Sequence, residues 1–113
     1  MTTVTIGVAT RDEIKARFVR AMSTGRRSAP FIGFPDERTL WKTLTPARWD
    51  MLKTMTGAGP LALREVARRL GRDVRGVHAD AHALLAAGLI ERNADGFHFP
   101  YDAVRVDFVL KAA

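Results

Sequence analysis

The sequence predicts a single domain of the α+β class. Three observations predict it: helical spacing of apolar residues in several segments, glycine and Asp-Gly turn signals between them, and strand-like alternation near both ends of the sequence. The chain has 113 residues, which is an ordinary length for one domain, and 47% of them are hydrophobic. That fraction supports a real core rather than a disordered chain.

The N-terminal part predicts a strand followed by a helix. Thr3–Val8 alternates apolar and polar residues, as a strand with one apolar face does. Thr10 and Glu13 then have the spacing of a capping box, so a helix is expected to begin there and to end near Ser23–Gly25. Its apolar stripe is Ile14, Phe18, Val19 and Met22.

A small, polar and basic segment, Gly25–Pro30, is the expected linker, and Phe31–Phe34 is a short extended piece. Pro35-Asp36-Glu37 is typical of a helix start. Thr45-Pro46 is a second one, with an N-cap threonine and a proline at the first helical position, and it predicts a helix over Pro46–Thr56.

The next segment predicts two helices joined by a tight turn. One carries Leu63, Val66, Ala67 and Leu70 and ends at Gly71. Asp73 is the expected N-cap of the other, which runs from Val74 to about Ala87 and ends before Gly88. The buried stripe of this second helix is expected to be Val74, Val77, Ala81, Leu84 and Leu85.

Three strands complete the prediction. Leu89–Arg92 and Phe97–Pro100 flank the turn Asn93–Gly96, and alternation resumes from Val104 to Leu110. Two helices with a glycine turn followed by a hairpin predict a winged helix-turn-helix, with an additional N-terminal strand–helix segment and a C-terminal strand. We therefore divide the chain into an extension at 1–35, with a role in dimerisation, and a winged helix-turn-helix with C-terminal strand at 36–113.

This fold predicts which side chains reach nucleic acid. The outward residues at the start of the second helix read base edges in such a motif, and an arginine there can bind guanine O6 and N7. The expected base-reading positions are Arg75, Gly76, His78 and Ala79, with His82 one turn further on. The expected phosphate contacts are Arg64, Arg68 and Arg72, and Arg92 flanks the tip of the hairpin.

Several of these residues also have simpler structural explanations. Arginines on an amphipathic helix are often only a solvated face. His78 and His82 have the i, i+4 spacing of a metal pair, but no third ligand is evident, so no metal site is expected. Asp80 would repel phosphate, so it is expected to face a neighbouring helix or solvent. Phe18, Trp41, Trp49 and Phe108 fall on apolar stripes and are expected to pack in the core.

The charge favours an anionic partner, with nucleic acid first. Lys and Arg total 18 against 12 acidic residues, a net charge of +6. Much of the excess lies in residues 1–60, where Arg20, Arg26, Arg27, Arg48 and Lys53 either extend a nucleic-acid footprint or serve another anionic partner.

Other classes find little support. The chain has no cysteine, which excludes disulfides and thiolate chemistry and is compatible with the cytoplasm. Its apolar runs are shorter than the ~20 residues that span a bilayer, and no signal peptide is evident. Phosphate-binding glycine loops and hydrolase motifs are absent, and the acidic pairs lie at helix starts, so neither an enzyme nor a cofactor is expected.

The segment Leu61–Phe99, with LREVARRLGRDVRGVHADAHALLAAGLIER, resembles the winged helix-turn-helix of MarR- and ArsR-type transcriptional regulators. Leu40–Met55 and Phe99–Phe108 also resemble a small prokaryotic group of predicted DNA-binding regulators, so that the likeness covers about residues 36–110. In this resemblance the recognition positions fall on Arg75, Gly76, His78 and Ala79. The wing falls on Arg92–Gly96, where one arginine and one aspartate replace the more basic tip of strong minor-groove readers.

The resemblance implies a sequence-specific, cytoplasmic DNA-binding regulator, a homodimeric repressor that binds double-stranded DNA through two half-sites. Some members of the group are encoded beside toxin-like proteins. The alternative is therefore an antitoxin that neutralises a partner toxin and autoregulates its operon. A winged helix that mediates only protein contacts is a third option. Thr3–Ser23 and Ala103–Leu110 are expected to form the dimer interface or a sheet with each other.

Overall fold

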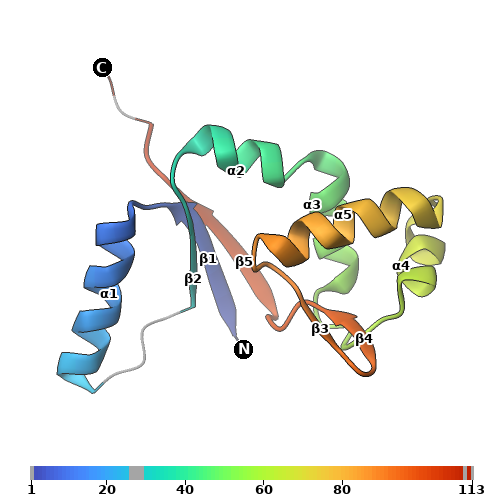
Figure 1. Cartoon of the computed structure of the whole chain (residues 1–113), viewed down its shortest axis with the longest axis horizontal. Coiled ribbons are helices and arrows are strands. Elements are labelled where there is room, and N and C mark those ends of the chain that lie inside the picture. Colours follow the sequence, from blue (N-terminus) through green and yellow to red (C-terminus); the bar gives the residue numbers. More distant parts are fainter. Residues whose placement is uncertain (1, 26–29, 111, 113) are drawn as a thin grey trace.

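The computed structural model describes residues 2–25, 30–110 and 112, and it has helices and strands in an α+β arrangement (Figure 1). In chain order they are β1 (Thr3–Val8), α1 (Arg11–Thr24), β2 (Phe31–Phe34), α2 (Glu37–Thr43), α3 (Pro46–Met55), α4 (Leu63–Leu70), α5 (Val74–Ala86), β3 (Glu91–Asn93), β4 (Gly96–His98) and β5 (Ala103–Asp107). The α+β class expected from the sequence is thereby confirmed.

One sheet joins the two ends of the described chain. Its strand order is β2-β1-β5, and β1 runs parallel to both neighbours, with Ile6 opposite Ile32 on one side and Val106 on the other. Val4 and Ile6 on β1 are fully buried. The sheet crosses the expected boundary at residues 35 and 36, so the N-terminal strands and the C-terminal strand form one structure, as one of the two sequence-based alternatives predicted.

Helices α2 to α5 and the hairpin lie together on the side of this sheet away from α1 (Figure 1). β3 and β4 are antiparallel, and Leu61 pairs with Phe97 on the other side of β4, with N···O distances of 2.7 and 2.9 Å. Leu61 therefore adds a single-residue third strand to the hairpin. A continuous core connects Val4 and Ile6 of the sheet with Met51, Val77 and Leu84 of the helices.

Local signals place the helix starts. Thr10, Asp36, Thr45 and Asp73 are the N-caps of α1, α2, α3 and α5, and each side chain accepts a backbone N–H of its own helix. The predicted caps Thr10, Thr45 and Asp73 are thereby confirmed. Helix α1 ends at Gly25, which has a positive φ, as the sequence indicated.

Several expectations about burial are wrong. Phe18 is 64% exposed and Trp41 is 57% exposed, so neither packs in the core. Val74, the first residue of α5, is also exposed, whereas Val77 and Ala81 of the same helix are buried. The strands are shorter than expected, since β3 begins at Glu91 and β5 ends at Asp107.

The whole apolar stripe of α1 lies at the surface. No residue of this helix is buried, and Met22 is 70% exposed. Helix α1 touches the sheet at β2, where the Arg17 guanidinium carbon lies 4.1 Å from the centre of the Phe31 ring. The predicted linker, including Arg26 and Arg27, lies largely outside the described residues. None of the described helices is long and apolar enough to cross a membrane.

Candidate nucleic-acid interface

Helices α4 and α5 are joined by a three-residue turn, Gly71–Asp73. Gly71 has φ 64°, which a glycine adopts without strain, and the Arg72 N–H donates to the Ala67 carbonyl at 3.0 Å. The Asp73 carboxylate then caps α5 by accepting the Arg75 N–H at 3.4 Å. These bonds hold the first turn of α5 at the surface beside α4.

The first turns of α5 present the residues that the sequence singled out. Arg75, His78 and Ala79 are exposed, and among the described residues none forms an ion pair with Arg75. Gly76 is half-buried, and a Cβ there would lie 3.1 Å from Nη2 of Arg72. The exposed turn therefore offers a guanidinium and an imidazole on either side of Gly76 in the sequence, a residue with no side chain of its own.

His82 connects α5 to the hairpin rather than projecting freely. It is half-buried, and its ring centre lies 4.2 Å from that of His78 and 6.0 Å from that of Phe97. Within the described ranges, no cluster of three or more His, Cys, Asp or Glu side chains could hold a metal ion.

Arg72 is held by an ion-pair cluster made of Arg48, Arg72 and Asp80, which we call the Asp80 cluster. Arg72 Nη2 lies 2.8 Å from one oxygen of Asp80, and Arg48 Nε lies 3.1 Å from the other. Arg48 also donates from Nη1 to the Thr43 carbonyl at 3.1 Å. The cluster ties α5 to α3 and to the end of α2.

The Asp80 cluster binds the guanidiniums of two basic residues that the sequence suggested for contact with an anionic partner. The side chains of Arg48 and Arg72 are only 23% and 31% exposed, and Nη1 of Arg72 is buried without a protein partner. Both guanidiniums are thus committed to a carboxylate, which favours a positioning role. Asp80 faces a neighbouring helix, as expected, but nothing in the sequence spacing points to Arg48, 32 residues away.

Glu65 engages two arginines on the surface of α4. Its carboxylate accepts hydrogen bonds from Arg68 and from Arg69 Nε, the latter at 3.0 Å. These bonds lower the pKa of Glu65 from 4.5 to about 2. Arg68 is nevertheless well exposed, and Arg64 is exposed without an ion pair among the described residues, so both remain accessible to an anion.

The tip of the hairpin carries one cation. The Arg92 guanidinium carbon lies 5.4 Å from the centre of the Phe97 ring, an arrangement that holds an otherwise exposed side chain against β4. Asn93 accepts the Asp95 N–H at 2.9 Å and closes the turn. Arg64, Arg68, Arg75 and Arg92 therefore provide exposed guanidiniums from α4, α5 and the hairpin.

The sequence model of the HVO_A0114 family matches residues 43–106, which is more than half of the chain. The chain belongs to the HVO_A0114 family. The HVO_A0114 match runs from the last residue of α2 into β5, so it includes the Asp80 cluster, the α4–α5 turn and the hairpin. β1, α1 and β2 lie before it. Comparison with curated proteins and with solved structures gave no match.

Proposed function

We propose that this chain is a sequence-specific DNA-binding transcriptional regulator that acts as a homodimeric repressor. The observation that carries the proposal is the exposed first turn of α5, where Arg75, His78 and Ala79 project from a helix held across α4 by a three-residue turn. A recognition helix enters the major groove of DNA in this orientation, with its N-terminal residues toward the bases.

The order of elements supports a winged helix-turn-helix. Helix α3 is followed by the single paired residue Leu61, by α4 and α5, and then by a hairpin whose β4 strand bonds to Leu61. The hairpin would be the wing, and the contact of His82 with Phe97 fixes it beside α5.

The chemistry of the exposed side chains fits a polyanion. Arg75 can donate two hydrogen bonds to guanine, while Arg64, Arg68 and Arg92 are exposed cations of the kind that bind phosphates. Arg72, held by Asp80, positions α5 and offers less to phosphate than its place in the sequence predicted.

Two features favour a homodimer: the two half-sites of a typical operator and an uncovered apolar stripe on the chain. Two copies read half-sites about 34 Å apart, and the described part of this chain offers one candidate recognition helix, α5. The uncovered stripe of Phe18 and Met22 on α1 supplies an apolar surface for a second copy.

The test is to select a binding site with the purified protein and then measure Arg75→Ala on that site and on random DNA. Loss of a base reader should weaken binding to the selected site by about 1–3 kcal/mol and leave random DNA nearly unchanged. Arg38→Ala is the matched control, because Arg38 is exposed on α2 without an ion pair among the described residues. Equal affinity of Arg75→Ala and the parent protein for the selected site would refute the assignment.

The α1 stripe also favours a second candidate, an antitoxin that binds a toxin protein through α1 and represses its own operon. The stripe lies outside the family match and is exposed to solvent, as a docking surface would be. Sedimentation separates the candidates. A stable dimer of this chain alone favours the repressor, whereas a monomer that binds the protein encoded beside it favours the antitoxin.

A further inference from the structure

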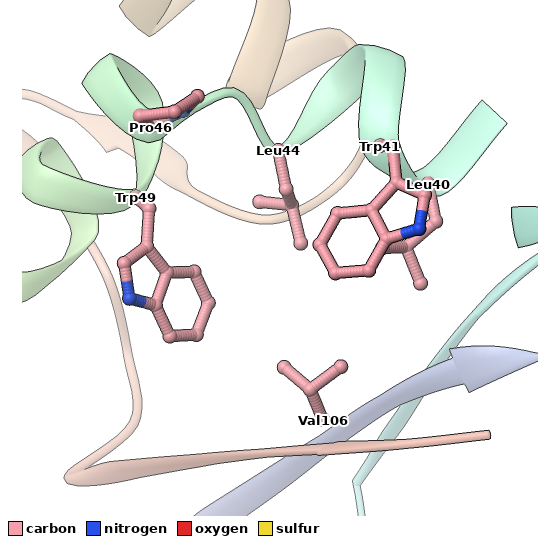
Figure 2. A pocket seen from close by; sticks show the side chains of 6 residues that line it. All are labelled: Leu40, Trp41, Leu44, Pro46, Trp49 and Val106. Carbon is pink, nitrogen blue, oxygen red and sulfur yellow. The ribbon is translucent and has the colours of Figure 1, made fainter. Parts of the chain in front are cut away.

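A hollow with apolar walls lies between α2, α3 and β5, away from the exposed turn of α5. Its volume is about 550 Å³, and its walls are Leu40, Trp41, Leu44, Pro46, Trp49 and Val106. Figure 2 shows the two indoles on either side of Leu44, with Val106 of β5 facing them across the hollow.

The walls are held in place by contacts outside the hollow. Arg48 Nη1 donates to the carbonyls of Lys42 and Thr43, which fixes the end of α2 against α3. The Phe108 ring packs edge-on against Trp41, with ring centres 5.9 Å apart. Leu40 and Leu44 belong to the core, so the hollow has a rigid floor.

The size of the hollow fits a small molecule. Pockets for small ligands span roughly 300–1,000 Å³ and have mostly apolar, aromatic walls. A second protein chain would instead need a patch of about 800 Å² on each partner. Trp41 is 57% and Val106 39% exposed, so the hollow is open to solvent on one side and is suited to a single ring system.

The walls also define the chemistry of the occupant. None of the six residues carries a charge or an amide side chain, so an anionic group inside would lose its hydration without gaining a counter-charge. Two indole rings offer faces and edges for stacking. We propose that this hollow binds a neutral, largely apolar organic molecule that contains a ring, and this proposal stands whether or not the chain binds DNA.

The experiment uses the tryptophans of the protein itself. The chain has two, and both line the hollow, so tryptophan emission reports on this site. We suggest titration of the full chain with the neutral fluorophore N-phenyl-1-naphthylamine, with excitation of tryptophan and detection of energy transfer to the probe. We expect saturable binding with about one probe per chain.

Two arginine substitutions on the same segment provide a matched pair. Val106→Arg places a charged side chain in the hollow and should weaken probe binding about tenfold or more. Val109→Arg introduces the same side chain at a residue that is 74% exposed and does not line the hollow, and it should leave binding within about twofold of the parent protein. If the circular dichroism spectrum shows that Val106→Arg is unfolded, Val106→Phe narrows the hollow without a charge or a third tryptophan and should also weaken probe binding.

Three outcomes would overturn the proposal. One is probe binding that never saturates, and another is binding that a folded Val106 variant leaves unchanged. The third is a tryptophan emission that shifts with protein concentration while the probe does not bind, because the hollow is then covered by a second copy of the chain.

Discussion

Asp80 links more elements than any other single carboxylate of the proposed interface. Its two oxygens receive guanidiniums from α3 and from the turn before α5, and its side chain is only 15% exposed. The sequence predicted that Asp80 would avoid DNA, because a carboxylate repels phosphate. It could not identify Arg48 as a partner, since contacts between residues 32 apart depend on how helices pack.

Asp80→Asn should destabilise the protein by about 1–3 kcal/mol, because it leaves two partly buried guanidiniums without their counter-charge. Chemical denaturation at neutral pH measures this loss. Asp50→Asn is the control, since Asp50 is exposed on α3 and makes no ion pair among the described residues, and it should change stability by less than about 0.5 kcal/mol. Equal stability of the Asp80 and Asp50 variants would contradict the role of the cluster.

Glu65 should make stability depend on acid pH. Its pKa is about 2 in the folded chain and 4.5 ordinarily, so its stabilisation is complete above about pH 4.5 and is lost as the pH falls toward 2. The urea midpoint should therefore fall less between pH 6 and pH 2.5 in Glu65→Gln than in the parent protein. Glu37→Gln is the control, because Glu37 is exposed and forms no ion pair among the described residues. Its urea midpoint should fall between pH 6 and pH 2.5 as much as that of the parent protein.

Among the residues predicted to contact bases, helical periodicity predicted the exposure of Arg75, His78 and Ala79 correctly, whereas Gly76 and His82 are half-buried. The Glu65–Arg68 pair has the i, i+3 spacing that predicts a contact on one helix face, whereas the pair of Arg72 with Asp80 depends on how the α4–α5 turn packs against α5. Contact of any of these residues with DNA stays a prediction.

Elements with strong local signals were predicted closely, and those that depend on distant pairing were not. The helix starts at Thr10, Thr45 and Asp73 follow from side chains that cap the adjacent backbone. Leu61 gave no signal as a strand, because one residue shows no alternation and its pairing comes from Phe97. In the hairpin, Ala94 and Asp95 form the turn and Gly96 already belongs to β4.

Two glycines of the α4–α5 unit should differ in their response to alanine. Gly76 lies within α5, where alanine favours the helix by about 0.5–1 kcal/mol, but its Cβ would lie 3.1 Å from Arg72 Nη2, the atom that Asp80 holds at 2.8 Å. The two effects oppose each other, so Gly76→Ala should change stability by less than about 0.5 kcal/mol. Gly71 has a left-handed backbone, so Gly71→Ala should destabilise the protein by about 1 kcal/mol. Urea titration measures both changes.

The Gly76→Ala variant also tests the place of α5 in the proposed interface. If Gly76 lies against DNA, the added methyl group should weaken binding to the selected site although the stability of the protein is nearly unchanged. Unchanged affinity in this variant would place Gly76 away from the bases.

For the whole molecule, the uncovered stripe of α1 predicts association between copies. Phe18→Glu should convert a dimer of twice 12.5 kDa into a monomer of 12.5 kDa, because it puts a charge in the centre of the stripe. Analytical ultracentrifugation measures the mass. Ala16→Glu adds the same charge to an exposed position on another side of α1 and should leave the dimer intact. A monomeric parent protein would contradict the homodimer.

The pairing of β1 with β5 has a consequence for the order in which the chain folds. Thr2 bonds to the side chain of Asp102, 100 residues later, and the two strands then continue side by side. During synthesis, β1 can pair with β2 early. It can pair with β5 only after all the other helices and strands of the described chain have been made. Closing so long a loop is slow, whereas α3, α4 and α5 make contacts within a short stretch of sequence. The unit that carries the proposed interface is therefore expected to fold first, and completion of the sheet to be the slow step.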